Sequence, residues 1–561
     1  MVRSRSSRRN PDFLDSSAGR WLGLLSLNLL SFACASFAQG FTPACPRPVA
    51  GSEVLNPPEI RSRQNALELN LYFRGDALHR DELPLRYCYV TDSGLQSPTL
   101  RVKPGDRLII HFHNQLNRIH IANEPGNETG DASNHQKTDC SEVAMAPTGT
   151  NLHFHGLDIA PVCHQDDVIH TTIQPGETFD YQVVIPKSTT PGLYWYHPHL
   201  HGFTERQVQG GASGALIVEG DAPQNLAANL PERVLVLRDQ PLSDVSPSEQ
   251  ARPSWDISLN FVPVLYKDYV PAKIRVSASQ KELWRVLNAG AGTIFDLQVL
   301  IEGKPQTLEV LAIDGVPLEK TNTHRLTTDL VLPPASRAEF VVTTPPSGKE
   351  ARLVTRSWDT GQVGDIDPSR PIATLRGEVS ATRIAPPSVG DAAPIVARDM
   401  VSDLRHVKAT TNRKLYFSEL PEDPNDPDAV TYFFLTLAGQ KPAVYDMGAS
   451  PNIEVHQGEV EDWLIENRAL EDHVFHAHQL HFQILEINGK SVPDREIRDT
   501  VNVDHWSGSG PYPSVRVRMD FRGSTLVGGV FPYHCHILRH EDMGMMGTIR
   551  VLPSIHAAGQ K

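Results

Sequence analysis

The residues with the most specific chemistry lie near the C-terminus, in the segment HCHILRHEDMGMM. Neighbouring side chains on a strand point to opposite faces, so Cys535 would face one side while His534 and His536 face the other. His540 and Met545 follow in the next turn. One thiolate, two imidazoles and a weak thioether make a blue-copper electron-transfer site. We predict that Cys535, His540 and axial Met545 hold such a copper, and that His534 and His536 bind other metals beside it.

The segment EDHVFHAHQLHF holds three more histidines in an HxxHxH pattern. His476 and His478 lie at alternate positions and face one way, whereas His473 faces roughly the other way. This spacing can serve two metal centres from one segment. We predict that His473 is the second imidazole of the blue-copper site.

Two earlier segments, NLHFHG and YWYHPHLHG, each place histidines at alternate positions. On a strand the members of such a pair share a face and can bind adjacent metals. The candidate residues are His153, His155, His197, His199 and His201.

The sequence HFH also occurs a second time, at His111 and His113. That copy lies in a run that reads as a plain strand ending in Asn114-Gln115. We predict a structural role for this pair.

The elements that must position these residues are short apolar runs between Pro and Gly turns, and helical periodicity is scarce. With 44 Pro and 39 Gly, turns are many. Such runs are typical of β-sandwiches. We predict an all-β chain with strands at Arg107–Phe112, Phe179–Ile185, Gly214–Val218, Arg233–Leu237 and Gly547–Val551.

The 561 residues are too many for one ordinary core. We divide them into three sandwich-sized blocks at residues 45–220, 230–385 and 410–555. Between the last two lies a Pro- and Asp-rich connecting strap that includes Pro386-Pro387, Pro421 and Pro424. The net charge of −14 argues against a general nucleic-acid binder.

Residues 1–38 read as an export signal: a basic leader, an apolar stretch from Trp21 to Ala38, and small residues at a cleavage site after Ala38. The alternative is an N-terminal membrane anchor, but the stretch is short and contains Ser and Asn. No later stretch is long and apolar enough to span a membrane. We therefore predict a periplasmic or extracellular protein without a membrane span in its mature form.

Cleavage after Ala38 removes Cys34 and leaves five cysteines, an odd number. Four of them can form two disulfides in an oxidising compartment, although sequence alone does not fix the pairing. We expect Cys140 to pair with Cys163 and Cys45 with Cys88. The remaining cysteine is Cys535, which sits between two histidines.

Taken together, HFHG, HPH, HVFHAH and HCHILRHEDMGMM stand in the order and spacing of the multicopper oxidases, the family of laccases, bilirubin oxidases and bacterial cuprous oxidases. The sequence resembles this family over nearly the whole mature chain, including WRVLNAG, LAIDG and LPPASRAEF in the middle block. The resemblance implies three consecutive cupredoxin-like Greek-key sandwiches. It places a copper cluster between the first and third, and no ligands in the middle one.

The resemblance also implies four coppers. It assigns His473, Cys535, His540 and Met545 to the type 1 copper, and His153 and His476 to the type 2 copper. The type 3 pair takes the six remaining ligands, which are His155, His197, His199, His478, His534 and His536.

The implied reaction takes single electrons from a small donor and reduces O₂ to water. Carboxylates near the cluster would supply protons. Glu541 matches one acidic residue of the family, and Asp166 resembles another, although the alignment could shift to Asp167.

The donor is less specified. Of the eight Met, three lie in the terminal motif, so a Met-rich insertion is not visible. We therefore expect a phenol or aromatic amine. The alternatives are a metallo-oxidase for Cu(I) or Fe(II), and a copper-binding or tolerance protein. Fe(II) oxidation needs acidic residues beside the blue-copper histidines; Asp494, Glu496 and Asp499 lie in the right region of the sequence.

Two rival classes fit less well. Copper nitrite reductases lack the paired HxH motifs, and a cupredoxin that had lost copper would lack ligands.

Overall fold

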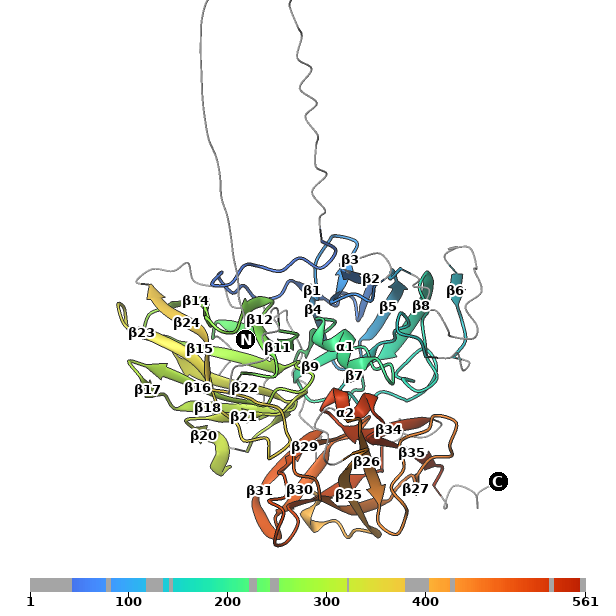
Figure 1. Ribbon diagram of the computed structural model, residues 1–561. Helices are drawn as coiled ribbons and strands as arrows, with labels where there is room; N and C mark the ends of the chain where they lie inside the picture. Colours follow the sequence, from blue (N-terminus) through green and yellow to red (C-terminus); the bar gives the residue numbers. More distant parts are fainter. Residues whose placement is uncertain are drawn as a thin grey trace, which may run out of the picture. The chain divides into compact units, whose positions relative to one another are not determined.

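The computed structural model of the chain describes residues 43–76, 82–117, 135–140, 145–220, 230–242, 252–319, 322–378, 403–423, 429–523 and 529–554. In these residues the strands form six sheets (Figure 1). The predicted leader at residues 1–38 and most of the connecting strap lie outside them. The all-β class predicted from the sequence is confirmed.

The first block contains two five-stranded sheets, ordered β1-β4-β10-β9-β7 and β3-β2-β5-β8-β6. One apolar core gathers residues from both sheets, among them Leu100, Phe112 and Tyr196. Its strands are β1 (Glu59–Arg61), β2 (Ala66–Asp76), β3 (Arg86–Thr91), β4 (Thr99–Val102), β5 (Arg107–Asn114), β6 (His135–Lys137), β7 (His153–His155), β8 (Glu177–Val184), β9 (Gly192–His197) and β10 (Gly214–Val218).

The second block has two sheets, built on the orders β13-β12-β11-β15-β22-β18-β19 and β14-β24-β23-β16-β17, around a second core. Its elements are β11 (Glu232–Gln240), β12 (Asp256–Leu259), β13 (Val262–Val264), β14 (Ala272–Ser277), β15 (Lys281–Asn288), β16 (Phe295–Ile301), β17 (Lys304–Pro305), β18 (Leu308–Ile313), β19 (Val316–Pro317), η1 (Thr323–Arg325), β20 (Leu326–Thr327), β21 (Leu330–Leu332), β22 (Arg337–Thr343), β23 (Glu350–Arg356) and β24 (Arg370–Glu378).

The third block pairs sheets β26-β25-β28-β33-β30-β31 and β27-β35-β34-β29-β32 over a third core. Its elements are η2 (Leu404–His406), β25 (Thr411–Pro421), β26 (Thr431–Leu437), β27 (Ile453–His456), β28 (Val460–Asn467), β29 (His473–Ala477), β30 (Phe482–Ile487), β31 (Lys490–Arg498), β32 (Thr500–Val503), β33 (Ser514–Asp520), β34 (Val530–Cys535) and β35 (Met546–Leu552).

The five runs predicted as strands all lie within or overlap strands of the structure: β5, β8, β10, β11 and β35. One detail of the strap is wrong. Pro421 is the last residue of β25 and pairs with Thr431 of β26. A proline is tolerated there because it lies at the end of β25, next to the edge strand β26 and beyond the part of β25 that pairs with β28.

Strand β9 links two cores, because its alternate side chains point to opposite faces. Tyr194 and Tyr196 pack into the core of the first block. Leu193 and Trp195 pack with residues of the second block, such as Val236. His197 continues the face of Trp195, and the two rings stack with centroids 4.0 Å apart. Two hydrophobic cores therefore hold this histidine in place.

Two short helices, α1 (Thr204–Gln209) and α2 (Leu538–Asp542), join the first and third blocks. The backbone N–H groups of Thr204 and Glu205 donate to the carboxylate of Asp542, at 3.0 and 2.8 Å. These donors are the unpaired amides at the start of a helix.

The predicted disulfides are confirmed: Cys45 pairs with Cys88, and Cys140 pairs with Cys163. Cys535 is a free, buried cysteine. Within the described ranges, none of the helices has the length and apolar character that crossing a membrane requires.

Candidate metal centre

Three side chains converge at one end of the third block. Cys535 ends β34, His473 begins β29, and His540 lies on α2. The Cys535 Sγ atom lies 3.6 Å from His473 Nδ1 and 3.7 Å from His540 Nδ1, and the two nitrogens are 3.1 Å apart. All three residues are buried. The HxxHxH and HCH segments therefore meet as the sequence predicted.

Met545 is tied to this group through the backbone. Its N–H donates to His540 O at 2.8 Å, and its carbonyl accepts from Cys535 N at 3.1 Å. The side chain is fully buried in the same core as Cys535.

Burial strongly affects the acid–base chemistry of this group. Desolvation raises the pKa of the Cys535 thiol and lowers the pKa of His540 to about 4. The imidazole is therefore neutral at neutral pH and offers a lone pair. A thiolate forms in such a place only beside a strong positive charge, and a bound metal ion supplies one.

A carboxylate meets the outer nitrogen of each of these histidines. Glu419 Oε1 lies 2.9 Å from His473 Nε2, and Glu471 Oε1 lies 3.1 Å from His540 Nε2. Both carboxylate side chains keep about a tenth of their surface exposed (11% and 12%), whereas the histidines are at most 5% exposed. Solvent therefore reaches the two carboxylates, whereas the histidines behind them are almost fully covered.

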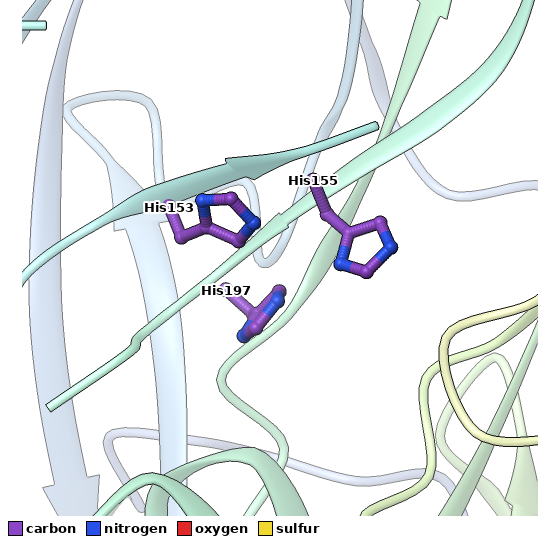
Figure 2. A group of neighbouring side chains, drawn as sticks. All are labelled: His153, His155 and His197. Carbon is purple, nitrogen blue, oxygen red and sulfur yellow. The ribbon is translucent and has the colours of Figure 1, made fainter. Parts of the chain in front are cut away.

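A second group of eight histidines lies between the first and third blocks. Within the first block, β7 and β9 are antiparallel neighbours, and His153 pairs directly with His197. Figure 2 shows the imidazoles of His153, His155 and His197 projecting from these strands toward one another. Their candidate ligand nitrogens all lie within 4.8 Å.

The third block adds its own histidines to the same space. His199 Nε2 lies 3.3 Å from His534 Nε2, and His478 Nε2 lies 3.2 Å from the same atom. His155 stacks on His476 with ring centroids 4.1 Å apart. His536 lies 5.2 Å from His155 by ring centroid.

Burial favours the neutral form of these imidazoles, in which one ring nitrogen of each carries a lone pair. Desolvation lowers the pKa of His534 to about 3. It also lowers the pKa well below the usual value for six further members of the group, which are His155, His197, His199, His476, His478 and His536. Neutral imidazoles whose nitrogens face each other at about 3.2 Å cannot all donate, so cations between them would satisfy the lone pairs.

The tautomers of several of these histidines are set by acceptors on the protein. The Nδ1 atoms of His197, His476 and His534 lie 2.9, 2.7 and 3.0 Å from carbonyl oxygens. The opposite nitrogens of His197 and His476 are buried without any hydrogen-bond partner. A ring that donates on one side offers its lone pair on the other, which is the usual arrangement of a metal-binding histidine.

Comparison with known proteins fits this donor set. The family model described as multicopper oxidase matches residues 141–223 and 421–554, the segments that carry the histidine motifs. The chain belongs to the multicopper oxidase family. It is a copper-dependent oxidoreductase that uses O₂.

Several relatives share this architecture. The chain is similar to a multicopper oxidase of Staphylococcus aureus (25% identity; 82% of this chain and 83% of the relative) and a laccase of Haloferax volcanii (25%; 89% and 84%). An iron transport multicopper oxidase of Candida albicans is 25% identical over 80% of this chain and 70% of its own. The solved metallo-oxidase of Campylobacter jejuni has the same fold, with a TM-score of 0.63 at 23% identity over 90% of this chain and 96% of that one.

In this multicopper oxidase, Asp166 touches the histidine cluster and Asp167 does not. The Asp166 carboxylate lies 3.0 Å from His153 Nδ1 and accepts from Phe154 N at 3.0 Å. Asp167 instead contacts His170. Of the two neighbouring aspartates that the sequence left open, Asp166 is therefore the one that contacts the cluster.

Glu541 is fully buried between two cluster histidines. One carboxylate oxygen lies 3.2 Å from His534 Nδ1, and the other lies 3.6 Å from His199 Nε2. Burial, reinforced by the neighbouring Asp542, raises the pKa of Glu541 well above its usual value. Since consecutive helix residues point about 100° apart, α2 directs His540 to one metal group and Glu541 to the other.

Asp494, Glu496 and Asp499 lie in the right region of the sequence to stand beside the blue-copper histidines, but in the structure they contact other residues. Asp494 accepts hydrogen bonds from Thr323, and Glu496 pairs with Arg498. The acids in that position are Glu419 and Glu471. The sequence could have indicated Glu471, because it precedes His473 by only two residues. It gives no such signal for Glu419, which comes from a strand 54 residues away from His473.

Asp499 belongs to a buried network around the cluster. Both of its oxygens accept from Arg337 of the middle block, at 2.8 and 2.6 Å. Its backbone carbonyl accepts from His476 Nδ1, and Oδ1 lies 3.3 Å from His155 Nε2. The middle block therefore supports two cluster histidines without contributing a histidine of its own.

The second HFH pair, His111 and His113, lies elsewhere, on the outer side of β5. His111 bonds to Asp180 and Glu68, and His113 lies 2.9 Å from Asn70. The partners of both rings are carboxylate and amide groups of the first block.

Arg337→Met tests the support from the middle block. Removing one partner of a buried ion pair leaves the other charge uncompensated, and we expect a loss of about 3–5 kcal/mol in the free energy of unfolding. Denaturant unfolding of the copper-free chain at neutral pH measures this. Arg352→Met is the matched control, since Arg352 pairs with Glu350 on the surface at 2.8 Å and should contribute about 1 kcal/mol or less.

The effect of Arg337→Met also has a defined pH dependence. Burial raises the pKa of Asp499, but Arg337 outweighs burial and the pKa falls below its ordinary value. A carboxylate with a lowered pKa stabilises the fold above its unfolded pKa of about 3.9 and loses that effect as the pH falls further. The difference between wild type and Arg337→Met should therefore shrink below about pH 4, and a constant difference would contradict this account.

Proposed function

We propose that the chain couples four one-electron oxidations of a small reducing substrate to the four-electron reduction of O₂ to water. The observation that carries this proposal is the position of Cys535 between two metal groups. Its side chain points to His473 and His540, while its neighbours His534 and His536 belong to the histidine cluster. One strand thus joins the two groups through covalent bonds.

We assign four coppers to these residues. His473, Cys535, His540 and Met545 would hold the mononuclear copper. His153 and His476 would hold the single copper of the cluster. The coupled pair would take two sets of three: His199, His478 and His534, whose ligand nitrogens lie within 4.8 Å of one another, and His155, His197 and His536, whose ring centroids lie 5.2–5.8 Å apart.

Bound copper would supply the one-electron chemistry and the reduction of O₂. The chain supplies the path between the centres. A copper held by Cys535 would be connected to His534 and His536 through the bonded atoms of Cys535 and the adjacent backbone. Met545, as a weak thioether ligand, would hold the potential of the mononuclear site lower than an apolar residue would.

Protons would reach the cluster from buried carboxyl groups. Glu541 lies against two cluster histidines, and burial raises its pKa, which favours the protonated form. It is therefore placed to hold a proton and give it up on the cluster side. Asp166 would act differently, by holding the Nδ1 proton of His153 and so directing Nε2 into the cluster.

We propose phenols or aromatic amines as donors. Oxidation of a phenol releases its hydroxyl proton, and Glu419 is the nearest acceptor on the outer edge of His473. Residues 360–362 of the middle block hydrogen-bond to Leu470 and Asp472, which flank Glu471. The middle block thereby borders the place where a donor would approach.

A second candidate donor is Fe(II), favoured by one observation. A carboxylate lies against the outer nitrogen of each of the two mononuclear-site histidines. Carboxylates are ligands suited to a hard cation. A metal ion held there would lie one side chain away from either histidine. The similarity to an iron transport multicopper oxidase agrees with this alternative.

We also propose that the mature protein is periplasmic or extracellular. The two disulfides support this, because such bonds persist in oxidising compartments.

Cys535→Ser tests the proposed function directly. The copper-loaded wild type should contain four coppers per chain and show intense blue absorption. The variant should lose the blue absorption and O₂ uptake with any donor, while keeping about three coppers, because Cys535 serves only the mononuclear site. Elemental analysis and the visible spectrum report both quantities. A blue spectrum in the variant, or a wild type well below four coppers, would overturn the assignment.

Glu541→Gln tests proton delivery. Replacing an acid by its neutral amide should slow O₂ reduction by about 10²-fold or more, the usual contribution of a general acid, while the blue absorption stays. Turnover under saturating donor and single-turnover reoxidation of the reduced enzyme measure this. Glu422→Gln, at an exposed position, is the control, and equal rates in both variants would remove Glu541 from the mechanism.

The double variant Glu419→Gln/Glu471→Gln separates the two donor classes. A cationic donor should lose its binding site, so the KM for Fe(II) should rise by about 10- to 100-fold. The KM for a neutral phenol should change only slightly. O₂ uptake with each donor is the measurement, and Glu486→Gln, which removes a surface partner of Arg516, is the control. A parallel rise for both donors would mean that the acids serve only to support the histidines.

A further inference from the structure

A small cavity lined by sulfur and nitrogen ligands borders the histidine cluster. Its volume is about 10 Å³, and three of the eight methionines in the chain line it. A space of this size holds one small occupant. The lining residues are Met145, Val168, Ile169, His199, His201, Tyr445, Met447, Pro532 and Met546.

The lining of the cavity includes both an exposed residue and buried ones. Met447 is 39% exposed, whereas Met546 is only 5% exposed and pairs across the strands with His534. His199, on the inner side, is buried and contacts the same His534. A ligand entering past Met447 would therefore arrive next to two cluster histidines.

A specific backbone contact holds the outer wall. Tyr445 N donates to Gly544 O at 3.1 Å. Gly544 has a φ of +96°, and a Cβ there would lie 2.2 Å from Val444 Cγ1. Only glycine allows this approach, which brings the segment that carries Met447 over the start of β35.

His201 is the histidine of YWYHPHLHG for which the family resemblance implies no role. Its Nδ1 atom is buried and has no hydrogen-bond partner. The ring packs edge-on against Tyr445 with centroids 5.3 Å apart. A buried ring nitrogen without a partner in the wall of the cavity is available as a ligand.

The donor types select one class of ligand. Thioethers and a neutral imidazole suit a soft cation such as Cu(I). The described residues that line the cavity include no carboxylate, which hard divalent cations prefer. If these side chains only filled space, there would be no need for a buried imidazole nitrogen without a hydrogen-bond partner.

We propose that this cavity is an accessory binding site for a single Cu(I) ion, held by Met145, Met447 and His201, through which copper is delivered to the cluster at His199. The inference rests on the proposed function only in taking His199 and His534 as cluster ligands. The accessory site is additional to the four coppers assigned above.

Titration of the copper-loaded enzyme with Ag(I), a soft monovalent ion that undergoes no redox reaction with the protein, tests the site. Wild type should bind one Ag(I) per chain beyond its copper, measured by calorimetry and elemental analysis. Met145→Leu/Met447→Leu keeps the side-chain volumes but removes two sulfurs, and His201→Phe keeps a ring without nitrogen. Each variant should weaken Ag(I) binding by at least about 10- to 100-fold, since losing a direct ligand should cost no less than losing an outer partner.

Met519→Leu, in the core of the third block, is the control and should bind Ag(I) as wild type does. In a second arm, the copper-stripped full-length chain is reloaded with Cu(I) under anaerobic conditions. The double variant should fill its cluster several-fold more slowly, yet reach four coppers and the same blue absorption at the end.

Three results would overturn the proposal: no extra Ag(I) in wild type, equal Ag(I) binding in the variants, or unchanged loading with a raised KM for O₂, which would make the cavity an oxygen channel. Failure of the proposed function is seen separately, as a final copper count or blue absorption that falls short in wild type.

Discussion

The structure depends on a set of buried imidazole lone pairs that point at one another. Side chains from the first and third blocks are brought together in this way, and facing ring nitrogens lie about 3.2 Å apart. Burial keeps these rings uncharged, so repulsion between positive charges does not drive them apart. It also makes the arrangement costly until cations fill the space, because buried polar atoms without partners lower stability. Copper binding and the docking of the first and third blocks are thus coupled in free energy.

The orientation of the rings is fixed from outside the metal groups. Backbone carbonyls accept from His197, His476 and His534, and carboxylates contact His153, His155, His473 and His540. The Asp499–Arg337 pair extends this support into the middle block, for which the family resemblance implies no copper ligands. A block without histidine ligands thereby influences the geometry of the cluster, and its segment near Glu471 borders the mononuclear site.

Much of this was predictable from sequence because it depends on local spacing. HxH on a strand and HCH at a strand end decide which faces the side chains occupy, and in the structure these side chains converge. The choice between Asp166 and Asp167 was not predictable, since both lie in a turn whose path sets which carboxylate reaches His153. Glu419 and Arg337 carry no local signal at all: their partners lie 54 and 162 residues away. The role of Asp499 was not predictable either, because an acidic run does not show which side chains it contacts until its ion pair with Arg337 is seen.

The contact between His199 and His534 joins residues 335 positions apart in the chain. During synthesis, the strands β7 and β9 emerge long before β34, and on their own they present one half of a metal site. Such a half-site would hold an ion loosely and without the redox partner that makes it useful. Complete metallation of the cluster therefore requires that both the first and the third block have been synthesised and folded.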